Sequence, residues 1–267
     1  MEGAALTMHQ IRLFFTALQF FTRLPIPRWV GFDPAWLNQA SRYFPLVGVV
    51  VAAISCAVYA VGFKLFPPMI AVILSTAAGI HVTGAFHEDG FADMCDGFGG
   101  GMTQERVLEI MKDSRIGAYG AIGIFCLLLL KCAVLTRLPP FGVMAALLFA
   151  HPMSRLMAVS LIWRLDYARA EGKSKPLAQK MRTMEFGIAA VTALLPALAL
   201  IYLHWLSWTM LISGLATALV ATVWLARKFV RRIGGYTGDC LGAVQQVTEV
   251  IFYLCVLAGL HTSAEFF

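Results

Sequence analysis

Long apolar segments alternate with short polar ones along most of the chain. Seven segments approach the ~20 mostly apolar residues that a transmembrane helix needs, and they lie at 43–63, 68–86, 117–136, 139–162, 187–204, 208–226 and 243–261. A shorter apolar stretch near the start is flanked by Arg12 and Arg23. We expect it to form an amphipathic helix at the membrane interface, and the chain is then broken by Pro25, Pro27 and Pro34.

The composition supports this interpretation. Of the 267 residues, 59% are hydrophobic and only 13% are charged, whereas a soluble domain averages about 45–50% apolar and about 25% charged residues. A soluble globule of this length cannot bury so much apolar surface, and disordered or collagen-like chains are excluded. We therefore predict an all-α polytopic transmembrane bundle, with about seven spans and an N-terminal interfacial helix, as one integral membrane domain over 1–267.

The basic residues predict which side of the membrane each loop faces. Seventeen of the 21 Lys and Arg residues fall in the N-terminal segment 1–42 or in the loops 87–116, 163–186 and 227–242. Because basic residues accumulate in cytoplasmic loops, these four segments are expected to face the cytoplasm and the C-terminus to face outward. The net charge of +6 then reflects membrane topology, and no nucleic-acid partner is expected.

The segment 87–101 is the most informative in the chain. It begins with His87 and Glu88, and Asp89, Asp93 and Asp96 follow at a spacing that places them on one face of a helix. Three neighbouring carboxylates at a membrane boundary repel one another unless a cation joins them. Oxygen ligands without sulfur suit Mg²⁺, which usually also binds substrate phosphates. The segment predicts a magnesium–diphosphate site, although a solvated acidic helix end remains the simpler alternative.

Basic and glycine-rich segments are candidate partners of this cluster. Lys112 and Arg115 are expected to bind phosphate oxygens, and Asp239 could complete the metal site from another helix. Arg155 lies inside the fourth span, where a charged side chain normally faces a polar interior, and it would bind a phosphate or pair with an aspartate. An anion-binding turn is predicted at Gly235, Thr237 and Gly238.

Local signals also place a short helix between the acidic segment and the third span. Thr103 is expected to cap its N-terminus, and the helix should run to about Met111. Small residues then recur at the start of the next span, where they allow close helix packing in the membrane; they are Gly117, Gly120 and Gly123.

Three blocks together resemble the cobalamin synthase family, the adenosylcobinamide-GDP ribazoletransferases called CobS in bacteria. They are residues 87–97, 111–120 and 235–243, and the stretches 20–25 and 44–48 are similar to the same family. The resemblance covers nearly the whole chain. Any one block would be unspecific, but the three in this order are specific.

The resemblance implies a Mg²⁺-dependent transferase of the bacterial cytoplasmic (inner) membrane, with its active site facing the cytoplasm. Such an enzyme joins adenosylcobinamide-GDP to α-ribazole, or to α-ribazole 5′-phosphate, and releases GMP in the nucleotide-loop assembly step of cobalamin (vitamin B12) biosynthesis. The family's acidic motif maps onto Asp89, Asp93 and Asp96. A homo-oligomer, or an association with other late enzymes of the pathway, is compatible with the resemblance.

The residues suggest how the reaction proceeds. Phosphoryl transfer depends mainly on positioning and charge neutralisation, which Lys112, Arg115 and Arg155 would supply together with Mg²⁺. The ribose 3′ hydroxyl is expected to attack the phosphorus attached to cobinamide, and a general base must accept its proton. The candidates for that base are Asp93, Glu88 and His87.

Two other classes of protein remain as alternatives. Another Mg²⁺-dependent membrane diphosphate enzyme, a CDP-alcohol phosphatidyltransferase or a prenyltransferase, would use a similar aspartate cluster. A transporter or channel would instead place charged residues near the middle of several spans. The acids of this chain gather at one end of the spans, which favours an enzyme.

Overall fold

The computed structural model describes residues 2–168 and 180–264, and nearly all of them are helical. The helices are α1 Glu2–Phe21, α2 Trp36–Ala40, α3 Phe44–Leu65, α4 Pro68–Thr83, α5 Phe86–Gly100, α6 Gln104–Ile110, α7 Ala118–Thr136, α8 Pro140–Arg164, α9 Thr183–Tyr202, α10 Trp208–Ile233 and α11 Gly238–Ala264. Two single 3₁₀ turns, Arg28–Val30 and Ser41–Tyr43, complete the described elements. Part of the predicted loop 163–186 lies outside the described residues.

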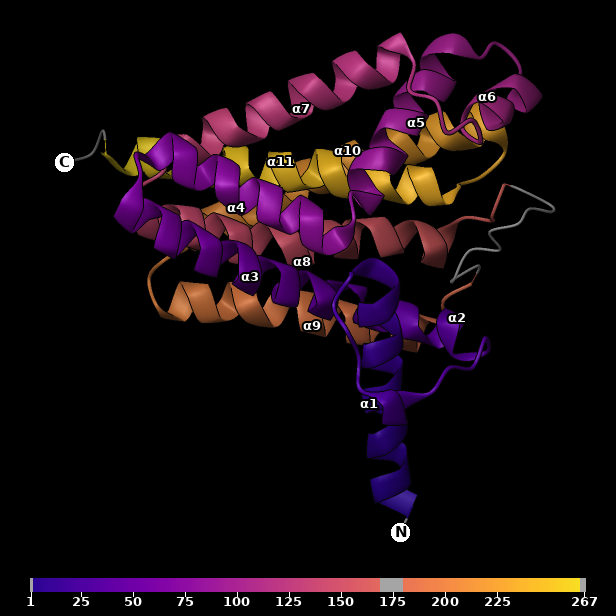
Figure 1. Cartoon of the computed structure of the whole chain (residues 1–267), viewed down its shortest axis with the longest axis horizontal. Helices are drawn as coiled ribbons and strands as arrows, with labels where there is room; N and C mark the ends of the chain where they lie inside the picture. The colour runs from indigo at the N-terminus through magenta and orange to yellow at the C-terminus, as the bar shows by residue number, and fades with distance from the viewer. Residues whose placement is uncertain (1, 169–179, 265–267) are drawn as a thin grey trace.

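The long helices form one bundle, in which α8 and α11 lie at the centre (Figure 1). Helix α8 contacts α3, α9 and α11, and α11 also contacts α5, α7 and α10. Of the most apolar window of α8, 89% is buried inside the protein, against 28% for the windows of α7 and α9. The peripheral helices therefore present their apolar side chains to lipid, while α8 is enclosed by other helices.

Six of the seven predicted spans are confirmed, because six helices in the described part of the chain are long and apolar enough to cross a membrane. The predicted span at 68–86 falls on the bent pair formed by α4 and α5, which makes a seventh span only if the pair is counted as one. All seven predicted windows fall on these helices, and the protein is a multi-pass membrane protein with an all-α fold. All residues of α5 except Phe86 belong to the segment 87–116, which was expected on the cytoplasmic side.

Proline and glycine set several of the helix boundaries. Pro45, Pro68 and Pro140 stand in the first turns of α3, α4 and α8, where a missing N–H removes no intrahelical hydrogen bond. Gly84 and Gly234 end α4 and α10 in the left-handed conformation, which glycine adopts without a steric penalty. These residues fix helix ends that the apolar pattern alone placed only approximately, as for α10, which runs to Ile233 where the predicted span ended at 226.

The two ends of the bundle differ in structure. Helix α1 crosses the bundle axis steeply at one end, and the short α2 and α6 lie at that same end (Figure 1). The turns between α3 and α4 and between α9 and α10 lie at the other end, together with the C-terminus. Helix α1 therefore does not join the parallel spans, as expected for a helix that lies at an interface.

A sharp elbow joins α4 to α5. The two helices are bent by 88°, and the bend is made by Gly84 and Ala85, which both have positive φ angles. The segment that follows α1 packs on this elbow: the Arg23 amide donates to the Val82 carbonyl at 2.8 Å, and Phe20 packs edge-on against Phe86. The elbow turns the acidic segment across the end of the bundle.

Candidate active site

Helix α5 presents its acidic residues to different surroundings. The segment is helical from Phe86 to Gly100, which confirms the predicted helix. Asp89 is exposed and Asp93 is half-buried, whereas Glu88 and Asp96 are buried. The predicted acidic face is therefore divided: only Asp89 and Asp93 border the solvent.

Asp96 closes the contact between α5 and the start of α7. Its two carboxylate oxygens accept hydrogen bonds from the backbone amides of Gly117 at 2.7 Å and Gly120 at 2.8 Å. Four amides at the start of a helix lack intrahelical partners, and a carboxylate is favourable there. Asp96 thus has a structural task in addition to the metal binding predicted for it. The predicted close packing of this span is confirmed, because a Cβ at Gly123 would lie 2.8 Å from the Cys95 sulfur.

Helices α5 and α11 cross in close contact, and this crossing brings Asp239 to the acidic segment. A Cβ at Gly90 would lie 3.0 Å from the Cα of Asp239. A Cβ at Gly242 would lie 3.0 Å from the His87 carbonyl oxygen. Gly90 lies between Asp89 and Asp93 in sequence, so the structure brings the backbone of Asp239 to the part of α5 that carries these two acids.

A hollow of about 780 Å³ adjoins the other end of α5. Asp96, Gly117 and Tyr119 line it together with Lys112 and Arg115. The structure therefore brings both predicted phosphate-binding side chains to one cavity beside the acidic helix. A hollow of this size can accommodate a nucleotide-sized ligand.

Arg115 is held in place at the rim of that hollow. Its guanidinium donates to both carboxylate oxygens of Asp113, with the shortest contact at 2.6 Å. These hydrogen bonds lower the pKa of Asp113 to about 2. The carboxylate is therefore ionised near neutral pH and orients Arg115. Lys112 is exposed at the same rim.

The glycine-rich turn before α11 is occupied by contacts with the protein itself. The amide of Tyr236 donates to the Asp166 carbonyl at 3.1 Å, and the Ala168 amide donates back to the Tyr236 carbonyl at 2.9 Å. A Cβ at Gly235 would collide with the Asp166 carbonyl oxygen, so this close approach requires glycine. The turn thus anchors the segment that follows α8.

Thr237 is fully buried at the start of α11, where its hydroxyl accepts from the Cys240 amide at 3.4 Å and donates to Asp239 at 3.2 Å. It caps the helix and orients Asp239, so its hydroxyl is already engaged within the protein and not at the surface where a substrate was expected. Gly238 has open space on its side-chain side, so of the predicted anion-binding turn it alone remains accessible.

The three candidate general bases are in different positions. His87 is buried and stacks on Phe21 with ring centroids 5.8 Å apart. Glu88 is buried and its Oε1 accepts from the Gln246 side chain at 2.7 Å. Only Asp93 borders the solvent on the same side as Asp89. The geometry therefore favours Asp93 over the other two as the acceptor of a substrate proton.

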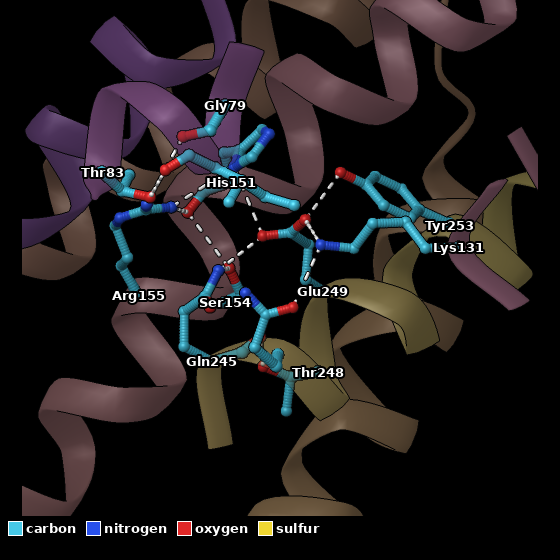
Figure 2. A network of polar contacts seen from close by, with 12 residues as sticks. Gly79, Thr83, Lys131, His151, Ser154, Arg155, Gln245, Thr248, Glu249 and Tyr253 are labelled. Atoms are coloured by element: carbon cyan, nitrogen blue, oxygen red, sulfur yellow. Dashed lines mark hydrogen bonds and ion pairs between the residues drawn. The ribbon is translucent and has the colours of Figure 1, made fainter. Parts of the chain in front are cut away.

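A network of polar side chains fills the bundle interior between α7, α8 and α11 (Figure 2). Glu249, 1% exposed, accepts from Lys131 at 2.7 Å and from the Tyr253 hydroxyl at 2.9 Å, and lies 3.3 Å from His151 Nδ1. Arg155 is 4% exposed and donates to the His151 carbonyl at 2.9 Å. Arg155 is therefore enclosed within the bundle and does not lie at the hollow beside Lys112.

Sequence reasoning missed most of this network. It singled out Arg155 but not Glu249, Gln245, Gln246 or Tyr253. Ionisable residues inside spans are rare and normally have a partner in the bundle interior. The signal was present: Gln245, Gln246 and Glu249 interrupt the apolar pattern of the seventh span.

The donor groups on α5 determine how a metal ion could be held. Among residues 2–168 and 180–264, no three His, Cys, Asp or Glu side chains are grouped so that they could hold a metal ion by themselves. Mg²⁺ usually binds one or two carboxylates together with waters and substrate phosphates. Asp89 and Asp93, which are one helical turn apart on α5, fit an ion whose coordination a substrate completes.

Comparison with known proteins identifies relatives over almost the full length. Residues 13–257 match the family described as cobalamin-5-phosphate synthase. Proteins named adenosylcobinamide-GDP ribazoletransferase are 47% identical in Ralstonia pickettii (92% of this chain, 95% of the relative) and 45% identical in Shewanella piezotolerans (93% and 95%). The protein of that name in Vibrio cholerae is 42% identical, over 97% of this chain and 98% of its own. No solved structure gives a significant match.

Proposed function

The chain belongs to the cobalamin-5-phosphate synthase family, and from this membership we propose that it is an adenosylcobinamide-GDP ribazoletransferase. It would join adenosylcobinamide-GDP to α-ribazole or α-ribazole 5′-phosphate and release GMP. The relatives above carry this name over at least 92% of the chain. The observation that carries the proposal within the structure is that the acidic helix α5 packs on Asp239 at Gly90 and, through Asp96, borders a hollow that Lys112 and Arg115 also line.

The chemistry follows from those positions. The 3′ hydroxyl of the ribazole attacks the phosphorus attached to cobinamide, the bridging P–O bond breaks, and GMP leaves with that oxygen. Lys112 and Arg115 offset the negative charge of the diphosphate, which is how enzymes assist phosphoryl transfer. Asp93 would accept the hydroxyl proton on the carboxylate oxygen that does not hold the ion proposed below, since the other two candidate bases are buried.

Magnesium is part of the proposal. Asp89 and Asp93 would hold the ion, with Asp239 approaching from α11. Bound there, Mg²⁺ would neutralise charge on the diphosphate oxygens. Asp96 is left out of this set, because both of its oxygens already accept hydrogen bonds from α7.

The assay that tests the proposal uses the purified full chain in detergent or nanodiscs. Adenosylcobinamide-GDP and Mg²⁺ are supplied with α-ribazole in one arm and α-ribazole 5′-phosphate in the other, and GMP and the cobalamin product are quantified. We expect equal amounts of GMP and corrinoid product in at least one arm. Absence of product in both arms, with an active relative run in parallel, contradicts the proposed function.

We also propose that the protein lies in the bacterial cytoplasmic membrane with the active site facing the cytoplasm. Support comes from the concentration of basic residues in segments at one end of the bundle. Single cysteines replacing exposed residues test it in a background without other reactive cysteines: Glu105→Cys lies on α6 and His204→Cys at the opposite end. In intact spheroplasts, a membrane-impermeant thiol reagent should label His204→Cys alone. Labelling of Glu105→Cys alone reverses the orientation.

A further inference from the structure

A continuous chain of side chains connects the bundle interior to the acidic helix. Lys131 bridges Glu249 and the amide oxygen of Gln246, at 2.7 Å and 3.1 Å. The amide nitrogen of Gln246 then donates to Glu88 at 2.7 Å. Glu88 is the residue before Asp89, so this chain ends on α5 next to the first exposed acid.

The buried polar atoms without a hydrogen-bond partner among the described residues include Glu88 Oε2, at the end of this connection, and Arg155 Nε and Gln245 Oε1, whose side chains are not part of it. Their side chains are 9%, 4% and 1% exposed, and all three line one cavity of about 20 Å³. A cavity above about 10–15 Å³ can hold one water molecule. Two acceptors and one donor match a water, which donates twice and accepts once.

The orientation of α5 about its own axis decides where the exposed acids point. Successive residues of a helix are rotated by about 100°, so an anchor at Glu88 fixes the direction of Asp89 and of Asp93 four residues later. The other end of α5 is tied to α7 through Asp96. Glu88 is instead held to the bundle core by the hydrogen bond from the side-chain amide of Gln246.

We propose that Glu88 and Gln246 form a positioning pair, completed by one buried water, which holds α5 so that Asp89 and Asp93 face Asp239 and the substrate. The inference rests on the proposed transferase function and assigns to Glu88 a role other than general base. Lys131 and Glu249 extend the pair into the core by fixing Gln246.

Single substitutions and a partner exchange test the pair. Glu88→Ala and Gln246→Ala should each lower kcat by on the order of tenfold to a hundredfold, because small misplacements of reacting groups have effects of that size. The KM for the ribazole substrate should stay within about twofold, since uniform binding is retained. The double Ala variant should be no worse than the more affected single one, because each removes the same contact.

The exchange Glu88→Gln with Gln246→Glu keeps one carboxylate, one amide and the contact between them. It also places the carboxylate beside Lys131. We expect it to recover at least a third of wild-type kcat, an outcome that a general base at Glu88 would not permit. Activity of the exchanged variant as low as that of Glu88→Ala, in protein that remains folded, overturns the inference.

Hydrogen exchange of the substrate-free protein gives a readout that does not depend on catalysis. The rate of amide hydrogen exchange over 86–100 should rise in both single Ala variants. It should return toward the wild-type rate in the double variant Glu88→Gln with Gln246→Glu. The matched control is Glu185→Gln, which removes another buried carboxylate, the partner of Arg42, and should leave exchange in α5 unchanged. Unchanged exchange in both single variants also overturns the inference. If the wild-type protein has no transferase activity, the proposed function is contradicted. The hydrogen-exchange rates of α5 in the variants still test the positioning pair in that case.

Discussion

The solvent side of α5 and the bundle interior both collect charged side chains, but they do so in opposite ways. On α5, Asp89 and Asp93 come from one turn of one helix and border the solvent. In the interior, Glu249, Lys131 and Arg155 come from three different helices and are almost fully buried. The first group is dense in sequence, whereas the second becomes a group only when the bundle forms.

The difference indicates which charges serve the fold and which serve chemistry. A buried charge must be paired, because leaving one alone in a low-dielectric interior costs several kcal/mol. The interior acids Glu249 and Glu88 are accordingly held by partners on other helices. Exposed carboxylates on one helical turn add no comparable stability. The cationic ligand proposed above would account for their presence at the end of the bundle.

The largest effect is expected at the exposed acids. Asp89→Ala or Asp93→Ala should lower transferase activity by about a thousandfold or more, since preorganised electrostatic groups contribute on that scale. The thermal unfolding midpoint should be nearly unchanged, because surface substitutions usually alter stability by less than ~0.5 kcal/mol.

The matched control for both variants is Asp33→Ala, an exposed acid of the N-terminal segment that lies outside the site. It should keep wild-type activity. Full activity in both α5 variants would remove the distinction between the two groups of charges.

The interior should respond in the opposite way. Glu249→Leu leaves Lys131 without its ion-pair partner and should reduce the free energy of unfolding by about 3–5 kcal/mol. Adding Lys131→Met to Glu249→Leu should restore much of that loss, because both charges are then absent. Unfolding in detergent, followed by circular dichroism, measures both variants.

An exposed ion pair provides the control for the interior substitution. Glu109→Leu breaks the contact between Glu109 and Arg106 on α6 and should change stability by less than ~1 kcal/mol. Equal effects at Glu109 and Glu249 would contradict the assignment of the interior network to the fold.

The same contrast explains how much could be predicted from the sequence. Six of the seven spans, the helical acidic segment and the cap at Thr103 depend on local pattern and were predicted correctly. The Thr103 hydroxyl accepts from the Arg106 amide at 3.3 Å. The stripe of small residues at the start of α7 was also predicted, because its spacing is local.

Contacts between distant segments could not be predicted. The turn at Gly235 binds the backbone of Asp166 and Ala168, and nothing in the local sequence indicates that neighbour. Gln246 and Glu88 are 158 positions apart. The sequence of a glycine-rich turn suggests phosphate binding whether its backbone amides are free or already hydrogen-bonded to the protein. Only the folded structure shows which of these two cases applies.

Asp96 shares features of both groups of charges, because it belongs to the acidic segment of α5 but is buried and hydrogen-bonded. We expect its substitution to have a smaller effect on stability than that of Glu249. Asp96→Ala removes the acceptor for two amides of α7 and should cost about 0.5–2 kcal/mol of stability, as for the loss of other helix caps. The Mg²⁺ concentration needed for half-maximal activity should be unchanged. A tenfold rise in that concentration would instead show that Asp96 is a metal ligand, as the sequence first suggested.

The smallest effect concerns the rim of the hollow. The pKa of Asp113 is about 2 in the folded protein, below the usual 3.8, mainly because Arg115 donates to its carboxylate. An acid whose pKa is lowered by folding gives its stabilisation above its ordinary pKa and loses it as the pH falls through the lowered value. From about pH 5 to 8 the carboxylate therefore stays ionised and holds Arg115.

Asp113→Asn should raise the KM for adenosylcobinamide-GDP by a few-fold, with the same ratio to wild type at every pH in that range. A ratio that changes across that range would mean that the pair titrates during catalysis.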